Sequence, residues 1–202
     1  MNKIKAIFCD VGGVLLTNGW DHSSRIKASE MFNFDAKEFE GRHQLLFGDY
    51  ETGKISLEYY LGHSLFFQPR SFSYQAFVDF MYEQSQAHYE MIDLIRKVKK
   101  EHSLKIVIFS NEGRELMLNR IKKFALTEFV DFFIVSCFVG LRKPDRTLYQ
   151  MALDFSQAAG DECIYIDDRA LFVEIANDLG IRSICHHDVA TTSQQLAELL
   201  SH

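Results

Sequence analysis

The sequence predicts an α/β fold in which helices cover both faces of a parallel sheet and a helical segment is inserted after the first strand. Two observations predict it. Short runs rich in Ile, Val and Phe alternate with longer amphipathic segments along most of the chain, and this alternation is typical of a parallel sheet covered on both sides. Residues 10–103 separate the first apolar run from the second, which is far more chain than a single crossover helix needs.

Apolar runs without polar residues at alternate positions are the expected strands, because strands buried on both faces read in this way. These runs cover residues 4–9, 104–109, 132–137, 163–166 and 182–185. In such a sheet ligands bind at the carboxyl ends of the strands. The residues that directly follow each run are therefore the first candidates for a functional site.

Amphipathic patterns predict the helices that connect these strands. They cover residues 87–101, 113–123, 145–158, 170–179 and 192–200. The segment 19–83 carries several helical patterns of its own and breaks the alternation. We therefore expect a core domain made of residues 1–17 and 86–202, and a helical cap domain made of residues 18–85.

Composition excludes several classes of function. A net charge of −6 argues against a nucleic-acid or anionic-membrane surface, which would need a basic patch. No apolar run reaches the roughly 18 residues of a membrane span, and the apolar stretch near the N-terminus is too short for a signal peptide. The four cysteines form no C-x-x-C pair and lie in or beside strand-like runs, so we expect free, buried thiols in a cytoplasmic protein and no zinc site.

Two of the expected strands are followed by residues suited to nucleophilic and anion-binding chemistry. Asp10 follows the first run, and Gly12 and Gly13 after it allow a tight turn and a close approach to a ligand. The alternative is a turn with a capping Asp. Ser110 and Asn111 follow the second run and precede a helix. They suit either a helix N-cap or a phosphate bound at the helix N-terminus.

Two further segments carry charge. Lys143 precedes Pro144, which is suited to open the next helix, and the alternative is a solvated basic loop. Asp167 and Asp168 follow the fourth run. Adjacent carboxylates at the end of a buried strand are costly unless a positive charge compensates them, and Mg²⁺ prefers such hard oxygen ligands. The alternative is helix capping with an ion pair to Arg169.

Together the four segments bring a carboxylate, a hydroxyl, an ammonium and an acidic pair to one edge of the sheet. Such a set holds Mg²⁺ and a phosphoryl group and includes a nucleophile. In the same order, the segments resemble the motifs of the haloacid dehalogenase-like (HAD) hydrolase superfamily: Asp10 in FCDVGGVL, Ser110 in FSN, Lys143 in RKPD and Asp167-Asp168 in IDDR. The resemblance covers nearly the whole chain. It implies a Rossmann-like core with the helical cap of the phosphoglycolate phosphatase and β-phosphoglucomutase branch.

The resemblance also implies an activity and a role for each motif. It implies a phosphatase for a small phosphorylated metabolite, such as a sugar phosphate, that works as a monomer or homodimer. Asp10 would attack phosphorus and form an aspartyl-phosphate. Ser110 and Lys143 would hold the phosphoryl oxygens, and Asn111 would help orient the site and bind the substrate.

The same resemblance implies a Mg²⁺ cofactor. The Asp10 carboxylate, the backbone carbonyl of Gly12 and the Asp168 carboxylate would bind the ion, and Asp167 would support this set. These ligands, the nucleophile and the phosphoryl-binding groups make up the predicted active site.

The chain departs from the family pattern at two positions. Phosphatases of this superfamily usually carry a second Asp two residues after the nucleophile, as general acid and base, where this chain has Gly12. Such catalysis contributes about 10²–10⁴-fold, and a branch resembling glucose-1-phosphate phosphatases shares the D-x-G variant. Phe172 stands where Asn or Asp is usual, which is expected to loosen the outer metal shell.

These departures keep other functions open. Without the acid, leaving groups of low pKa would be favoured, unless the cap supplies a substitute such as His22 or His43. A non-catalytic or weakly active protein of this fold is one alternative function. A 2-haloacid dehalogenase, in which Asp10 attacks carbon, is the other, although that chemistry needs no metal and leaves the acidic pair unexplained.

Overall fold

The computed structural model describes residues 3–201 and contains a five-stranded sheet in the order β3-β2-β1-β4-β5. Every neighbouring pair is parallel, and Phe8 of the central strand pairs with Val107 on one side and Tyr165 on the other. This sheet confirms the predicted fold class. The strands are β1 Ala6–Cys9, β2 Lys105–Ser110, β3 Phe132–Val135, β4 Cys163–Asp167 and β5 Arg182–Cys185.

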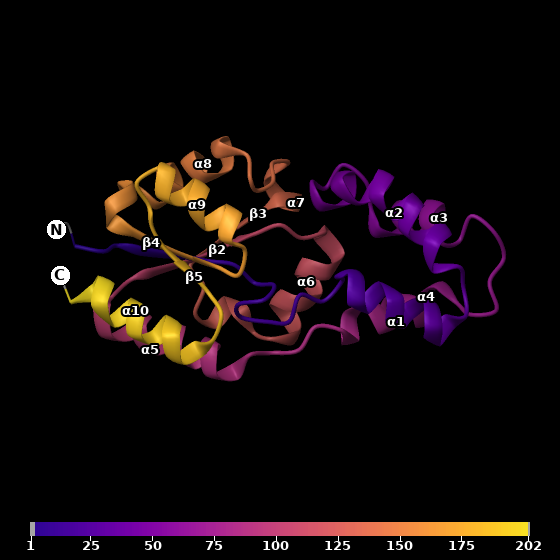
Figure 1. Cartoon of the computed structure of the whole chain (residues 1–202), viewed down its shortest axis with the longest axis horizontal. Helices are drawn as coiled ribbons and strands as arrows, with labels where there is room; N and C mark the ends of the chain where they lie inside the picture. Colours follow the sequence, from indigo (N-terminus) through magenta and orange to yellow (C-terminus); the bar gives the residue numbers. More distant parts are fainter. Residues whose placement is uncertain (1–2, 202) are drawn as a thin grey trace.

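Helices cover both faces of the sheet (Figure 1). Ile7 and Cys9 point into the apolar cluster beneath α5, α6 and α10, whereas Ala6 and Phe8 point into the cluster beneath α8 and α9. Each strand therefore buries alternate residues on opposite faces, which is why its sequence is apolar throughout. The helices are α5 Tyr89–His102, α6 Arg114–Lys123, α8 Arg146–Ser156, α9 Ala170–Asp178 and α10 Val189–Leu200.

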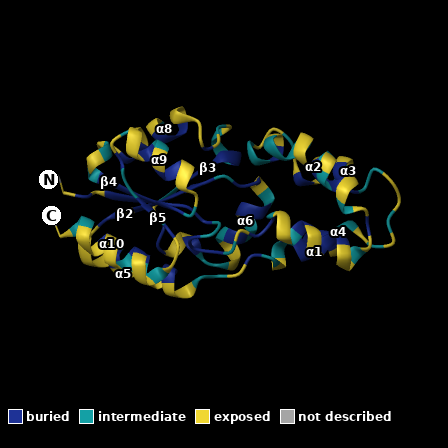
Figure 2. Cartoon of the chain, viewed as in Figure 1, coloured by how far each residue is buried: buried dark blue, intermediate teal, exposed yellow. Residues whose placement is uncertain are grey.

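Four helices form an insertion between β1 and α5, at the end of the molecule away from both termini (Figure 1). They are α1 His22–Phe32, α2 Ala36–Glu51, α3 Leu57–Ser64 and α4 Tyr74–Glu83. Their inner faces are buried (Figure 2) around an aromatic-rich cluster that includes Trp20, Phe39 and Phe77. We call α1–α4 the helical insertion; its apolar cluster is distinct from the two beside the sheet, and Leu116 of α6 also packs into it.

Several predicted boundaries differ from the structure by two or three residues, and two of the differences have a clear local cause. The third strand ends at Val135, not at residue 137, because the short helix α7 Ser136–Val139 begins there. The Ser-Cys-Phe-Val run begins with residues that are buried in this helix, and burial alone does not distinguish a strand end from a short helix. The last helix begins at Val189, three residues earlier than predicted, because the Asp188 side chain accepts a hydrogen bond from the Thr191 N–H and caps it.

The chain enters and leaves the helical insertion through two linkers that lie side by side, residues 17–20 and 84–88. The Thr17 N–H donates to the Gln86 carbonyl at 2.9 Å, and the Thr17 hydroxyl donates to the Gln84 carbonyl at 2.7 Å. Arg120 of α6 reaches both linkers, donating to the Ser85 hydroxyl and the Asn18 carbonyl, each at 3.0 Å. One arginine of the core thus fastens both connections to the helical insertion.

The structure also bears on the cysteines and on membrane spans. All four cysteines are free; Cys9, Cys137 and Cys163 are buried, and Cys185 is half-buried. Among residues 3–201, no helix combines the length and the apolar character that crossing a bilayer requires.

Candidate active site

The carboxyl ends of the three central strands bring the predicted residues together. Asp10 directly follows β1, Ser110 ends β2 and Asp167 ends β4. Because β1 pairs with both β2 and β4, these three ends are adjacent. Lys143, from the loop between α7 and α8, completes the group.

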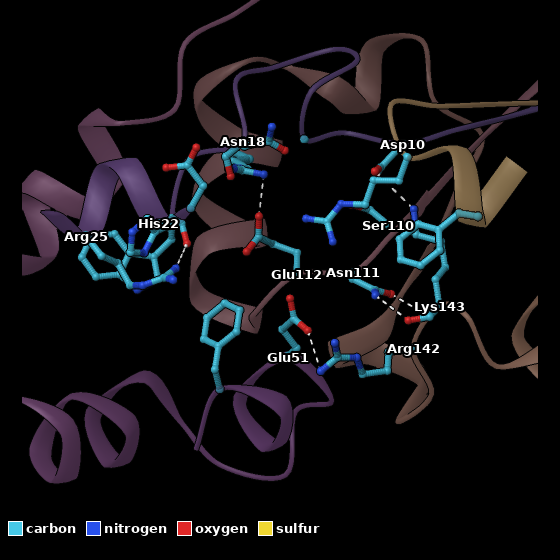
Figure 3. Close-up of a pocket in the computed structure, with 17 residues that line it drawn as sticks. Asp10, Asn18, His22, Arg25, Glu51, Ser110, Asn111, Glu112, Arg142 and Lys143 are labelled. Atoms are coloured by element: carbon cyan, nitrogen blue, oxygen red, sulfur yellow. Dashed lines mark hydrogen bonds and ion pairs between the residues drawn. The ribbon is translucent and has the colours of Figure 1, made fainter. Parts of the chain in front are cut away.

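A cavity of about 240 Å³ lies between this edge of the sheet and the helical insertion (Figure 3). Among the predicted site residues, the core contributes Asp10, Gly12, Ser110, Asn111 and Lys143 to its wall. The opposite wall comes from the entry linker and the helices α1 and α2. A ligand there would contact both parts of the chain.

Lys143 is a buried ammonium, not a residue of a solvated loop. Its side chain is 1% exposed, and its Nζ lies 2.6 Å from Asp167 Oδ2 and 3.2 Å from Asp10 Oδ2. It also donates to the Phe109 carbonyl at 3.1 Å. Burial lowers the pKa of Lys143, but the two carboxylates outweigh it, so the pKa lies above its ordinary value. The ammonium is therefore fixed in place and charged.

Asp10 is 8% exposed and accepts a hydrogen bond from the Val11 N–H at 2.7 Å. Burial raises the pKa of Asp10 to about 6, although the charge of Lys143 and a hydrogen bond from Ser110 lower it. At neutral pH the group is thus mainly a carboxylate beside an ammonium. This combination suits a nucleophile that must approach an anionic phosphoryl group.

Asn111 holds the backbone that carries Lys143. Its side-chain amide donates to the Lys143 carbonyl at 2.9 Å, and its side-chain carbonyl accepts from the Lys143 N–H at 2.8 Å. Both ends of the amide are engaged. Asn111 therefore positions Lys143 as well as lining the cavity.

The two acidic residues after β4 differ in their surroundings. Asp167 is fully buried and accepts hydrogen bonds from Lys143, from the Tyr165 hydroxyl and from the Arg169 N–H at 2.8 Å. Asp168 Oδ1, by contrast, is buried without a hydrogen-bond partner among residues 3–201. Asp167 thus positions Lys143, and Asp168 retains an oxygen that is open to a donor or a cation.

This unpartnered oxygen fits a divalent cation. One carboxylate oxygen from each of Asp10, Asp167 and Asp168 lies within 4.8 Å of the other two. Gly13, with a φ of +75°, keeps the space beside Asp168 open, because a methyl group there would lie 2.2 Å from Asp168 Oδ2. An all-oxygen set of this kind is suited to Mg²⁺.

The cavity wall also contains ionisable residues that the sequence analysis did not single out. Glu112 pairs with Arg120 in the core, and Glu51 of α2 lies 3.0 Å from Arg142 Nη1, which joins the helical insertion to the core. Burial raises the pKa of both glutamates, that of Glu112 to about 7. Glu112 lies only two residues after Ser110, and this short spacing was the one indication in the sequence that Glu112 lies at the site.

The two histidines considered as substitute acids lie in different environments. His22 lines the cavity. His43 is buried inside the helical insertion, outside the cavity wall, with its Nδ1 2.7 Å from the Tyr60 hydroxyl. Burial lowers the pKa of His43 to about 4. The proposal that His43 acts as an acid in the cavity is therefore wrong.

Phe172 covers the buried lysine. The Lys143 Nζ lies 5.1 Å from the centre of the Phe172 ring, which also lines the cavity. Tyr149 fixes the Phe172 backbone by donating its hydroxyl to the carbonyl at 3.2 Å. The aromatic face offers the ammonium a cation–π contact in the place where Asn or Asp was expected.

Residues 4–180 match the haloacid dehalogenase-like hydrolase family. The chain belongs to this family. It is 25% identical to bifunctional epoxide hydrolase 2 of Sus scrofa over 134 residues, which are 65% of this chain and 24% of that protein. It is also 25% identical to flavin mononucleotide hydrolase 1 of Arabidopsis thaliana over 161 residues, which are 79% of this chain and 64% of that protein. The chain thus spans about a quarter or less of the epoxide hydrolases that it matches.

Solved structures of the family share the fold. The HAD family enzyme bt-2542 of Bacteroides thetaiotaomicron, in complex with magnesium and inorganic phosphate, superposes with a TM-score of 0.79 at 19% identity, covering 94% of this chain and 98% of that chain. The L-2-haloacid dehalogenase RSc1362 superposes with a TM-score of 0.66 at 16% identity, covering 97% of this chain and 100% of that chain.

Proposed function

We propose that this hydrolase is a Mg²⁺-dependent phosphatase that acts on a small phosphorylated metabolite through an aspartyl-phosphate on Asp10. The observation that carries the proposal is the buried Lys143 ammonium, held between Asp10 and Asp167 at the edge of the cavity. A fixed cation beside a carboxylate is suited to an anionic substrate attacked by that carboxylate.

In this mechanism the core residues position and neutralise the phosphoryl group. The Asp10 carboxylate attacks phosphorus, while the Ser110 hydroxyl and the Lys143 ammonium hold the phosphoryl oxygens. Asn111 and Asp167 keep Lys143 in place through its backbone and its side chain. Phosphoryl transfer depends mainly on such positioning and charge neutralisation.

Asp10, the Gly12 carbonyl and Asp168 would hold the metal ion, with Asp167 behind them. When bound, Mg²⁺ neutralises charge on the phosphoryl oxygens. The Asp168 Oδ1 atom supports this set, since a buried carboxylate oxygen without a partner is unfavourable.

We further propose that the helical insertion, within residues 18–85, is the cap that selects the substrate. Its residues His22, Arg25, Phe47 and Glu51 form the wall opposite Asp10. A cavity of about 240 Å³ suits a small metabolite. The name of the Arabidopsis relative, a flavin mononucleotide hydrolase, supports a phosphate ester as the substrate class.

The test is hydrolysis of para-nitrophenyl phosphate with Mg²⁺, with EDTA, and in the variant Asp10→Asn. We expect EDTA to abolish turnover and the substitution to reduce it by at least about 10²-fold. Asp79→Asn, an exposed carboxylate on α4, is the matched control and should retain full activity. The proposal would be refuted if neither EDTA nor Asp10→Asn reduced turnover. If the wild type did not hydrolyse the substrate at all, a non-catalytic role would be favoured.

The structural likeness to an L-2-haloacid dehalogenase favours a second candidate, in which Asp10 attacks carbon and releases halide. The acidic group of Asp10, Asp167 and Asp168 argues against it, because that reaction needs no metal. Halide release from a 2-haloacid, measured with and without EDTA, separates the two. EDTA-resistant halide release without phosphate release would establish the dehalogenase.

A further inference from the structure

The cavity contains a buried carboxyl group that the mechanism above does not use. We propose that Glu112 is the general acid and base of the hydrolysis, and that it supplies the proton transfers for which Gly12 has no side chain. The inference rests on the proposed phosphatase function and adds a catalytic residue to it.

No side chain directly beside Gly12 can supply the proton donor and acceptor that residue 12 lacks. A methyl group on Gly12 would lie 3.0 Å from Asn18 Oδ1, so the Asn18 side chain occupies the space beside residue 12. A carboxamide neither gives up nor takes up a proton near neutral pH. The acid must therefore come from another part of the wall.

Glu112 lies where a leaving group would depart. Ser110 and Lys143 hold the phosphoryl oxygens, and Asp10 attacks in line, so the leaving group points away from Asp10 into the open cavity. In the view of Figure 3, Glu112 lies between Asp10 and Ser110 of the core and His22 and Arg25 of the helical insertion.

The backbone and side chain of Glu112 are held on several sides. Its N–H donates to the Ser136 hydroxyl at 2.9 Å, and its Oε1 accepts from the Gly113 N–H at 3.2 Å. Its Oε2 pairs with Arg120 of α6, which is itself 1% exposed. A carboxyl group fixed in this way is preorganised for proton transfer.

Burial, partly offset by the charge of Arg120, keeps the pKa of this carboxyl group near neutral pH. Burial raises the pKa of Glu112 to about 7, and the charges of Glu51 from α2 and Asp10 raise it as well, while Arg120 and the Gly113 N–H lower it. Tyr50 and Cys137 also face this group, and burial raises the pKa of each well out of the neutral range. A general acid and base works best with a pKa near the working pH.

The proton balance closes over one turnover. Asp10 forms a bond to phosphorus as the bond from phosphorus to the leaving oxygen breaks, and the Glu112 proton moves to that oxygen. The Glu112 carboxylate, beside Arg120, then takes a proton from the water that attacks the aspartyl-phosphate. The bond between phosphorus and Asp10 breaks, inorganic phosphate forms, and Glu112 is again protonated.

The experiment compares two substrates of similar size, para-nitrophenyl phosphate and phenyl phosphate. The first releases a weakly basic phenolate that needs no proton, and the second releases a strongly basic one. In Glu112→Gln we expect kcat/KM for phenyl phosphate to fall by about 10²–10⁴-fold, and that for para-nitrophenyl phosphate to fall by less than about tenfold. The control is Glu58→Gln, an exposed glutamate of α3 outside the cavity wall, which should leave kcat/KM for both substrates unchanged.

The pH profile provides a readout that a structural role would not move. For the wild type, kcat/KM for phenyl phosphate should decline above about pH 7, because the acid is then ionised. This decline should be absent in Glu112→Gln. In Arg120→Gln it should shift to higher pH, because loss of the neighbouring cation raises the pKa of Glu112. Glu112→Asp, which keeps the acid and its charge, should recover part of the phenyl phosphate activity.

Equal losses on both substrates in a Glu112→Gln protein that unfolds at the wild-type temperature would overturn the inference. So would a wild-type profile for phenyl phosphate without the alkaline decline. If Glu112→Gln does not fold, the wild-type and Arg120→Gln profiles decide. Failure of the phosphatase proposal itself is distinct, because para-nitrophenyl phosphate would then not be hydrolysed or Asp10→Asn would have no effect.

Discussion

Two buried polar clusters, one in the core and one in the helical insertion, differ in charge. In the core, Lys143 lies between Asp10 and Asp167. In the insertion, the Trp20 indole donates to the Tyr60 hydroxyl at 3.1 Å, and this hydroxyl is hydrogen-bonded to His43, whose pKa of about 4 keeps it neutral.

The difference in charge indicates that one cluster stabilises the fold and the other is suited to bind a ligand. Burying charges costs several kcal/mol per ion, and a neutral or apolar group often stabilises a fold as well or better. The cluster around Tyr60 uses neutral groups and gains packing and hydrogen bonds, and the buried charge of the insertion, Arg25 paired with Glu40, lies at the cavity wall. The core retains charges only at the edge of the cavity, where an anionic substrate would use them.

The largest expected effect tests the charged cluster. Lys143→Met should reduce hydrolysis of para-nitrophenyl phosphate by about 10²–10³-fold, because a fixed charge at the phosphoryl site is lost. Its sequence neighbour Arg142 is half exposed and pairs with Glu51 of the insertion, so Arg142→Met is the control and should change kcat less than tenfold. Similar losses in the two variants would mean that burial of the cation does not matter.

The next effect tests the neutral cluster through the pH dependence of stability. The pKa of His43 falls from 6.5 to about 4 on folding, so below pH 6.5 the unfolded chain takes up a proton that the native state does not. The free energy of unfolding should therefore decrease from pH 6.5 to pH 4, by up to about 3 kcal/mol from this residue. In His43→Gln, the free energy of unfolding measured with urea should decrease less between pH 6.5 and pH 4. Activity should stay unchanged.

The matched control for that variant is His63→Gln, an exposed histidine on α3, which should keep the wild-type pH dependence. A wild-type slope in His43→Gln would show that the neutral cluster does not titrate as proposed.

A smaller effect tests the contact between the two regions. Gly113 is the N-cap residue directly before α6, and a methyl group there would lie 2.0 Å from Tyr50 Cε1 of α2. Gly113→Ala should lower the free energy of unfolding by about 1–3 kcal/mol, because the buried ring must move. Gly62→Ala in α3 meets nothing within 4 Å and should raise it by about 0.5–1 kcal/mol. An equal response of the two glycines would contradict tight packing at this contact.

The smallest effect concerns a charge pair on the surface. Arg96 and Glu128 lie 2.8 Å apart with exposed side chains. Arg96→Gln should change the free energy of unfolding by no more than about 1 kcal/mol, because water and salt screen the pair, and the change should shrink further at high salt. If Arg96→Gln lowered the free energy of unfolding as much as is expected for Gly113→Ala, the pair would contribute as strongly as a buried contact.

The fold and the convergence of Asp10, Ser110, Lys143 and Asp167 could be predicted because their signals are local. Asp10, Ser110 and Asp167 each follow or end an apolar run, and the parallel sheet then brings these run ends together. The hydrogen bonds between Asn111 and Lys143 join two of the same motifs.

The opposite wall could not be predicted in the same way. Arg120 is a helical residue whose partners Ser85 and Asn18 lie far away in the sequence. Glu51 meets Arg142 only because the helical insertion folds back on the core. No periodicity or motif records such pairings, since they depend on how the helical insertion and the core face each other.

Gly19 lies in the entry linker with a φ of +69°, and a methyl group there would lie 1.9 Å from Arg120 Nη2. The same guanidinium holds the Ser85 hydroxyl, the Asn18 carbonyl and the Glu112 carboxylate. The absence of one side chain thus allows a single arginine both to join the two linkers and to be the counter-ion of the buried Glu112 carboxylate. Mutational drift at residue 19 would disturb the attachment of the helical insertion and the ionisation of Glu112 together.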